Sequence, residues 1–371
     1  MDLFRRALLR ACQIAVAATF VLAMLIPPGA AAPVQFSPMA SYPNFVEADF
    51  LVKDFLLANG EHLADAKFHY TMFGTPRRDA SGAITNAVLL LHGTTGTGRN
   101  FLAPSLADFL FGPDQPLDAT RFVLILPDGL GHGASSKPSD GLKGRFPHYG
   151  YGDEVEGQYR LLTEGLGIRH LKLVLGTSMG GMQTWIWGER HPQMMDALMP
   201  IASQPVAIAG RNMLWRRLII DAIRTDPDWH GGNYRRQPTH FIHFLPIFNI
   251  MVGNAPDLQT AASTRAAADA FYDRLVGQYA LTTDANDYLY WFESSADYDP
   301  SRDLEKITAK LVAVNFADDL LNPAELGVME AAMRRLPNAR YVLVPASPAT
   351  HGHQTLQSAV VWRDELVELL K

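Results

Sequence analysis

The feature of this sequence that most constrains its fold is a serine between two glycines, where an apolar run meets a helix-like segment. The run 172–175 leads into Gly176-x-Ser178-x-Gly180, and residues 179–190 have helical periodicity. A strand that turns directly into a helix leaves room only for small residues beside the serine. Such a turn lifts the hydroxyl out of the sheet, near a helix N-terminus whose N–H groups can hold an anion. We therefore expect Ser178 to be a nucleophile, and an ordinary serine in a glycine-rich turn is the alternative.

Short apolar runs recur along the chain and predict a sheet. Two strand-like segments, 52–57 and 66–73, are joined by a polar turn and predict an antiparallel start. The later runs are almost wholly apolar, as expected for buried parallel strands. They are residues 87–91, 122–126, 172–175, 197–201, 311–315 and 341–344. Because helical patterns such as 153–166 lie between several of them, we predict an α/β fold with a mostly parallel sheet flanked by helices.

One interval breaks this alternation of strands and helices. Residues 204–296 are rich in aromatic residues, Met and Arg, and they show helical periodicity without an apolar strand. We interpret them as a helical cap inserted into a core made of residues 32–203 and 297–371. A cap at this point would lie over the C-terminal ends of the strands, where open α/β sheets bind their ligands. A separate helical domain is the alternative.

The N-terminus has the pattern of an export signal. A basic segment, residues 1–10, precedes the apolar run 14–26, and a zone rich in Ala, Pro and Gly follows. The run is shorter than the roughly 20 residues that a membrane-spanning helix needs. We predict that residues 1–31 are a cleaved signal peptide and that the protein is periplasmic or secreted, with no stable membrane span after cleavage. An uncleaved N-terminal anchor is the alternative.

Composition argues against several other classes of function. The formal net charge of −6 disfavours a general nucleic-acid binder, which needs a basic face. The single cysteine, Cys12, lies in the predicted signal peptide, so we expect no disulfide in the mature chain. The pair His240 and His243 comes without a third ligand, and we predict no metal and no cofactor. The oligomeric state stays open, and a homodimer is one of the alternatives.

A nucleophilic serine needs a base to take its proton and a third group to orient that base. Asp318 and Asp319 follow the run 311–315, and the spacing Asp-x-x-x-Pro favours Asp319 as the acid. The expected base is His353, which a glycine precedes after the last apolar run. Asp318 and His351 remain the alternatives for the two roles.

Two backbone N–H groups should stabilise the oxyanion that forms when the serine attacks a carbonyl. They are the N–H of Met179, which follows the serine, and the N–H of Thr94, in the loop after the run 87–91. In the same regions we expect His92 and His132 to shape the site without taking part in the chemistry.

The cap contains one candidate substrate-binding segment, with Tyr234 and Arg235 as the residues of interest. A guanidinium can bind a carboxylate through two parallel hydrogen bonds. A solvated cap surface is the alternative.

Several of these segments together resemble the homoserine O-acetyltransferase family of the α/β-hydrolase superfamily. The resemblance covers residues 85–371. It is carried by residues 166–168, 176–183 and 231–234, by the loop 316–323, which contains Asp319 and which we call the acid loop, and by Gly352-His353. It implies an α/β-hydrolase fold with Ser178 as nucleophile, Asp319 as acid and His353 as base. It also implies an acyl-enzyme that is formed from an acyl-CoA and passed to an amino-acid hydroxyl.

The predicted export signal bears on the choice of function. Acyl-CoA and homoserine are cytoplasmic, so we favour an exported, esterase-like serine hydrolase that cleaves a small-molecule acyl ester through an acyl-enzyme. Water would be the final acceptor. The alternative is a homoserine O-acetyltransferase-like acyltransferase that uses acyl-CoA, and a catalytically silent binding protein is a third hypothesis from a different class.

Overall fold

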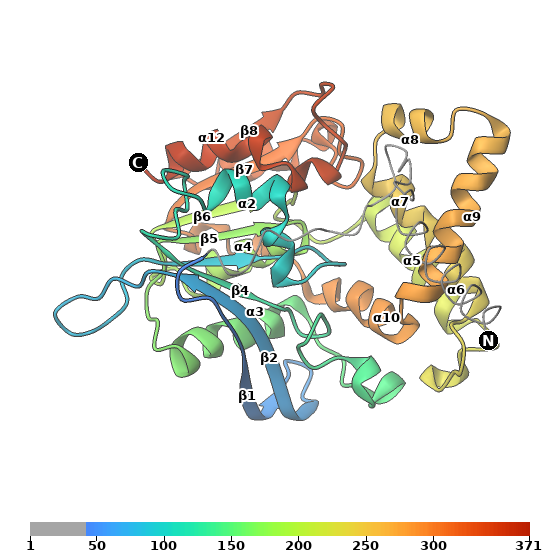
Figure 1. The fold of residues 1–371 in the computed structure, drawn as a ribbon, viewed down its shortest axis with the longest axis horizontal. Helices are drawn as coiled ribbons and strands as arrows, with labels where there is room; N and C mark the ends of the chain where they lie inside the picture. Colours follow the sequence, from blue (N-terminus) through green and yellow to red (C-terminus); the bar gives the residue numbers. More distant parts are fainter. Residues whose placement is uncertain (1–41) are drawn as a thin grey trace, which may run out of the picture.

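The computed structural model describes residues 42–371 (Figure 1). The predicted signal peptide, residues 1–31, lies outside the described residues. Within 42–371, no helix is both long and apolar enough to cross a membrane.

Eight strands form one sheet in the order β1-β2-β4-β3-β5-β6-β7-β8. They are β1 (Val46–Leu56), β2 (His62–Gly74), β3 (Ala87–Leu91), β4 (Val123–Pro127), β5 (Leu173–Thr177), β6 (Ala197–Ile201), β7 (Lys310–Phe316) and β8 (Ala339–Val344). The pairs β1–β2 and β2–β4 are antiparallel, and all the other pairs are parallel. This arrangement confirms the predicted α/β fold with a mostly parallel sheet.

Helices cover both faces of the sheet, because the central strands are apolar on both faces. Val88 and Leu90 of β3 pack in the cluster that contains α2 (Pro104–Leu110) and α12 (Ala359–Leu369). Leu89 and Leu91 point to the other face, in the cluster that contains α3 (Tyr151–Arg160), α4 (Met179–Arg190) and α11 (Val328–Met333). Figure 1 shows α2 and α12 on the side of the sheet opposite α3.

The segment between β6 and β7 contains six α-helices (Figure 1). They are α5 (Gly210–Arg224), α6 (Thr239–Phe244), α7 (Pro246–Val252), α8 (Ala255–Ala261), α9 (Arg265–Thr282) and α10 (Ala285–Glu293). We call these six helices and their connections the cap. Most of them gather at one end of the sheet, and α10 lies between the others and the core.

Helix α10 fastens the cap to the core. Asp287 accepts hydrogen bonds from the backbone N and the Oγ of Ser139, at 2.9 and 2.7 Å. The indole Nε1 of Trp291 donates to the Gly131 carbonyl at 2.6 Å. A buried apolar cluster also joins cap residues such as Phe292 to residues of the β1–β2 hairpin. The cap is therefore packed on the core through polar and apolar contacts.

Candidate active site

Ser178 occupies the sharp turn between β5 and α4. Its backbone has φ 54° and ψ −113°, a conformation that residues other than glycine rarely adopt. A Cβ on Gly176 would lie 2.0 Å from the Gly180 carbonyl oxygen, and one on Gly180 would lie 2.0 Å from the Leu91 carbonyl oxygen. Both glycines are therefore required for the turn that presents the serine.

His353 and Asp319 complete a chain of hydrogen bonds that begins at Ser178. His353 Nε2 lies 2.8 Å from Ser178 Oγ, and His353 Nδ1 lies 2.7 Å from Asp319 Oδ2. All three residues are buried, with exposed fractions of 9% for Ser178, 5% for His353 and 2% for Asp319. The Asp319 carboxylate also accepts from the Leu321 N–H and from the Asn322 amide, at 2.8 and 2.9 Å. The carboxylate thus holds the tautomer in which Nδ1 carries the proton and Nε2 can accept one from the serine.

The alternative acid and base lie outside this chain of hydrogen bonds. Asp318 Oδ2 accepts from Asn254 Nδ2 and from the Gly352 N–H, each at 2.9 Å. His351 Nδ1 lies 2.8 Å from Asp257 Oδ2 in a half-exposed pair. The structure therefore brings Asp319 and His353, rather than their neighbours, to Ser178.

The loop after β3 passes beside the serine and supplies one candidate oxyanion donor. A Cβ on Gly93 would lie 3.4 Å from Ser178 Cβ, so the loop is in contact with the nucleophile. Thr94 lines the pocket together with Ser178. Among residues 42–371, neither the Thr94 N–H nor the Met179 N–H donates to a protein acceptor. Both groups are thus free of protein acceptors among the described residues, and their role at an oxyanion stays a prediction.

Two buried histidines hold this loop in place. His132 Nε2 lies 2.6 Å from the Thr94 carbonyl oxygen, and its ring stacks on Trp291 with centroids 4.7 Å apart. His92 Nε2 accepts from the Gly129 N–H at 2.9 Å. Burial, together with the neighbouring His92, lowers the pKa of His132 to about 3, and burial also lowers the pKa of His92. Both rings are therefore neutral at neutral pH and act as scaffold for the Thr94 loop.

The pocket at Ser178 is small, about 60 Å³, and adjoins a larger cleft of about 700 Å³. Residues that line both are Thr95, Asn100, Phe248, Val252, Gln354 and Gln357. The far wall of the cleft is formed by α9, through Phe271, Leu275 and Tyr279 among others. A substrate can therefore approach the serine between the cap and the core.

Arg216, on α5, is a pocket residue that the sequence prediction missed. Its side chain lines the Ser178 pocket and is only 2% exposed. Its Nε donates to Asn212 Oδ1 at 3.0 Å, and its guanidinium carbon lies 5.0 Å from the Trp215 ring centroid. Among residues 42–371, no carboxylate lies within 4.0 Å of this guanidinium. The wall of the pocket thus carries a buried cation without a counter-ion.

A helical pattern could have found this arginine. The buried residues of α5 recur at helical spacing, and they are Trp215, Arg216, Ile219, Ile220 and Ala222–Ile223. Arg216 thus lies in the apolar stripe, whereas the adjacent Arg217 is exposed and pairs with Asp221 at 2.8 Å. A charged residue inside an apolar stripe is the signal that distinguishes the two arginines.

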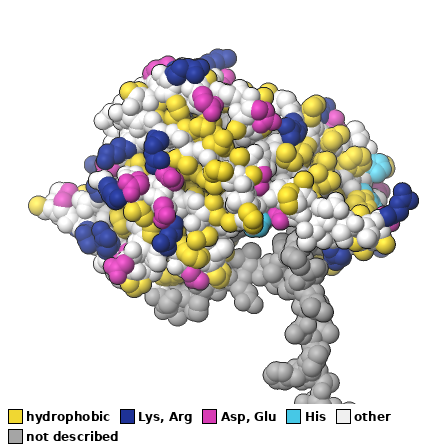
Figure 2. Space-filling view, turned by 90° about the horizontal axis from the view of Figure 1, so that it is seen from above, with side chains coloured by type: hydrophobic (Ala, Val, Ile, Leu, Met, Phe, Trp, Pro, Cys, Tyr) yellow, Lys and Arg dark blue, Asp and Glu magenta, His cyan; other side chains and the backbone are white. Residues whose placement is uncertain are grey.

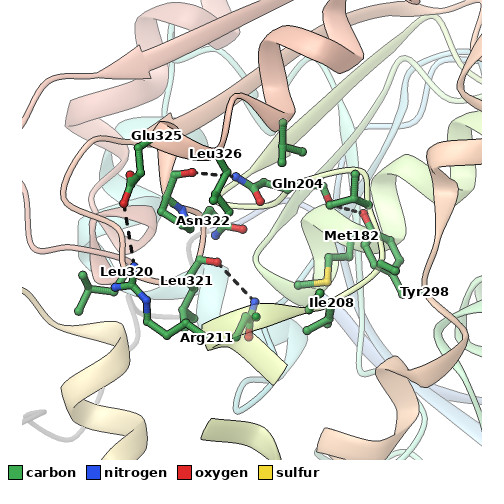
Figure 3. Close-up of a pocket in the computed structure, with 17 residues that line it drawn as sticks. Met182, Gln204, Ile208, Arg211, Tyr298, Leu320, Leu321, Asn322, Glu325 and Leu326 are labelled. Carbon is green, nitrogen blue, oxygen red and sulfur yellow. Dashed lines mark hydrogen bonds and ion pairs between the residues drawn. The ribbon is translucent and has the colours of Figure 1, made fainter. Parts of the chain in front are cut away.

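A second cavity, of about 340 Å³, lies on another side of the acid loop (Figure 3). It is lined from the segments 204–212 and 320–328, with Met182 and Tyr298. Figure 3 shows the ion pair between Arg211 and Glu325, which are 4.0 Å apart, beside this cavity. Leu321 lines both this cavity and the Ser178 pocket. The acid loop is therefore the partition between the two spaces.

The structure does not place Tyr234 and Arg235 at the Ser178 pocket. The Tyr234 hydroxyl accepts from the Asn286 N–H at 3.3 Å, and burial raises the pKa of this tyrosine. Arg235 is exposed on the cap surface, and neither residue is among those that line the pocket. Their predicted role in substrate binding has no support in this geometry, because sequence alone does not show which cap residues turn towards the serine.

The histidines of the cap are engaged in other contacts. His243 Nδ1 lies 2.9 Å from the Tyr272 hydroxyl, and His240 Nδ1 lies 3.9 Å from Asp226. In the part of the chain that the structure describes, no group of three or more His, Cys, Asp or Glu residues is arranged to hold a metal ion.

Comparison with known proteins places this geometry in a family. The family model for the alpha/beta hydrolase fold matches residues 86–348. A homoserine O-succinyltransferase of Methylibium petroleiphilum is 30% identical over 342 residues, covering 80% of this chain and 86% of that protein. A homoserine O-acetyltransferase of Thermobifida fusca is 28% identical over 333 residues, again with 80% and 86% covered.

Solved structures show the same fold. The acetyl esterase MekB superposes with a TM-score of 0.75 at 23% identity, covering 90% of this chain and 98% of that one. A homoserine O-acetyltransferase from Bacillus anthracis superposes with a TM-score of 0.77 at 19% identity, covering 88% and 98%. The chain belongs to the α/β-hydrolase fold family, as a member that is similar in sequence to the homoserine O-acyltransferases.

Proposed function

We propose that this protein is an exported serine esterase that cleaves a small-molecule ester through an acyl-enzyme on Ser178. The observation that carries the proposal is the buried chain of hydrogen bonds from Ser178 through His353 to Asp319, at 2.8 and 2.7 Å. In this arrangement His353 can act as the base for the Ser178 hydroxyl, and the Asp319 carboxylate orients His353.

The reaction proceeds in two halves. Ser178 Oγ attacks the ester carbonyl while His353 Nε2 takes its proton, and the Thr94 and Met179 N–H groups bind the oxyanion. His353 then gives the proton to the leaving alcohol, and Asp319 stabilises the imidazolium in between. In the second half His353 takes a proton from water, which attacks the acyl carbonyl. His353 then returns this proton to Ser178 Oγ as the ester bond to the serine breaks and the acid leaves.

The cleft that adjoins the pocket supports water as the acceptor. It leads from the serine to a wall formed by α9, and Arg274 is the one Lys or Arg among the described residues that line it. The phosphates of a coenzyme A are best bound by several cationic groups, and this lining supplies one. A small-molecule ester in this cleft fits the predicted export of the protein.

Labelling of the serine tests the proposal. The mature chain, residues 32–371, should react with a fluorophosphonate and hydrolyse 4-nitrophenyl acetate. Ser178→Ala should abolish labelling and lower kcat by about 10⁴-fold or more, because the nucleophile is lost. The exposed Ser81 provides the control, and Ser81→Ala should leave both unchanged. Equal labelling of the Ser178→Ala protein would overturn the proposal.

Acyl transfer is the second candidate, and the sequence relatives that are homoserine O-acyltransferases favour it. The two reactions share the acyl-enzyme and differ in the group that accepts the acyl moiety. Turnover with acetyl-CoA or 4-nitrophenyl acetate in the presence of homoserine, followed by mass spectrometry, separates them. Acetate as the product supports the esterase. O-acetylhomoserine as the product would support the transferase instead.

A further inference from the structure

One segment of the cap contacts the turn that carries the proposed base. Asn254 precedes α8, and its side chain is buried, with 6% exposed. Its Nδ2 donates to the Thr350 carbonyl oxygen and to Asp318 Oδ2, each at 2.9 Å. Thr350 lies three residues before His353, so the amide links the cap to both loops that supply the proposed acid and base.

Asp318 also binds Gly352, the residue that precedes the proposed base His353. The same Oδ2 that accepts from Asn254 also accepts from the Gly352 N–H at 2.9 Å. Partial burial acts to raise the pKa of Asp318, but the hydrogen bonds from Asn254 and Gly352 outweigh it and hold the pKa below its ordinary value. Asp318 is thus an ionised carboxylate that ties two segments together.

The turn is also packed tightly against the cap backbone. Gly352 has φ 60°, and a Cβ at this position would lie 2.5 Å from the Gly253 carbonyl oxygen. The chain therefore enters His353 through a residue that the cap contacts on one side and Asp318 holds on the other.

We propose that Asn254 and Asp318 are positioning residues, which together form a clasp that holds His353 Nε2 against Ser178. The clasp consists of Asn254, Asp318 and the Gly352 N–H. It rests on the proposed role of His353 as base, and it gives the cap a part in the chemistry without contact with substrate. A displacement of about 1 Å in a reacting group can cost roughly 10²-fold in rate, so the position of this turn is consequential.

A second contact joins the same two segments but differs in character. Asp257 and His351 form a pair whose side chains are 47% and 46% exposed. Exposed pairs of this kind contribute little to stability, because water screens the two charges. This pair is not part of the clasp, and it supplies a matched control on the same helix.

The sharpest variant is Asn254→Asp. The Asn254 Oδ1 accepts from the Asp257 N–H at 2.9 Å and so caps α8, and an aspartate keeps this acceptor. It loses the Nδ2 donor and sets a second carboxylate against Asp318. The other titratable groups that face this place are Asp257 on α8, His351 on the turn, and the proposed Asp319 and His353.

We expect Asn254→Asp to lower kcat for ester hydrolysis by about 10- to 100-fold at about pH 8, with KM within about twofold. The ratio of variant to wild-type kcat should rise towards one as the pH falls, because a protonated carboxyl can donate to its neighbour and restore the clasp. Asp318→Asn keeps an oxygen acceptor for both donors and should retain most of the activity, whereas Asp318→Ala should not. Asp257→Asn should leave kcat unchanged.

Two results would overturn the clasp. One is a wild-type kcat for Asn254→Asp at about pH 8. The other is a loss of kcat that stays constant with pH, which would indicate general damage to the fold. Ser178→Ala in the same assay keeps this test separate from the test of the proposed function. If the Ser178→Ala protein hydrolysed the ester at the wild-type rate, His353 would have no role as base, whatever the result for Asn254→Asp.

Discussion

Arg216 brings a positive charge into the wall of the Ser178 pocket, and no carboxylate of the described residues lies within 4.0 Å of it. A buried charge of this kind lowers stability unless a partner compensates it. A substrate could supply the missing partner if it were an ester with a carboxylate near the scissile bond. Within the proposed function, we therefore expect a substrate with such a group.

A methionine at this position separates stability from substrate choice. Arg216→Met keeps apolar packing against Trp215 and removes the unpaired charge, so the melting temperature should rise. The ratio of kcat/KM for 4-nitrophenyl hemisuccinate to that for 4-nitrophenyl butyrate, which differ mainly in charge, should fall by about 10-fold or more. Arg217→Met, at the exposed neighbour, should leave this ratio unchanged. An equal loss on both esters would show that Arg216 is not a carboxylate receptor.

Residues at strand ends were the easiest to predict. Ser178, Asp319 and His353 each follow an apolar run, and parallel strands bring such positions to one edge of a sheet. The choice of Asp319 over Asp318 needed only the spacing to Pro323. Arg216 was not predicted, because nothing in the sequence states how a cap helix is rotated relative to the serine.

At the scale of elements, α4 contains a carboxyl group whose proton affects stability. Glu189 lies near the C-terminal end of α4, and its Oε1 is buried without a hydrogen-bond partner. Burial and the neighbouring Asp303 raise the pKa of Glu189 from 4.5 to about 8. The folded state therefore binds this proton over a pH range in which the unfolded chain has released it.

The proton on Glu189 makes the free energy of unfolding depend on pH. Because the folded pKa is the higher one, the free energy of unfolding should fall as the pH rises from about 4.5 through about 8. Glu189→Gln cannot release the proton, so its stability should exceed that of the wild type by a margin that grows over this range. Urea unfolding at about pH 5 and about pH 9 measures the margin. The exposed Glu330→Gln should track the wild type, and a Glu189→Gln margin that does not change with pH would contradict the assignment.

Strands β3 to β8 were predicted within two residues at each end, because their apolar residues, which are buried in β3 to β7, leave a continuous signal. The first two strands run well beyond the predicted segments. The added residues of β1, 46–51, are exposed or only partly buried, and Leu51 is 55% exposed. An edge hairpin with one solvated face has no continuous apolar run, which is why its length could not be predicted.

At the scale of the whole molecule, the cap and the core share one hydrophobic cluster. It contains Phe55 and Phe68 of the β1–β2 hairpin together with Trp215, Phe241 and Phe292 of the cap. We therefore expect a single cooperative unfolding transition, with coincident midpoints for tryptophan fluorescence and far-UV circular dichroism in urea. Two separated transitions, or a cap that folds alone as residues 204–296, would contradict this expectation.

One face of the molecule, shown in Figure 2, bears on the prediction that the protein does not bind nucleic acid. On the face shown in Figure 2, acidic and basic side chains are interspersed among apolar ones. A polyanion needs a continuous basic strip, and this face does not present one. The formal net charge of −6 points in the same direction.

The contacts of α10 with the core also bear on which step limits the rate of turnover. Asp287, Trp291 and Phe292 hold this helix to the core, so we expect α10 to stay in place during turnover. We expect substrate to enter and product to leave through the opening beside α9. Turnover should then not depend on a hinge motion of α10, and a more viscous solvent should slow it only by slowing diffusion of the small reactants.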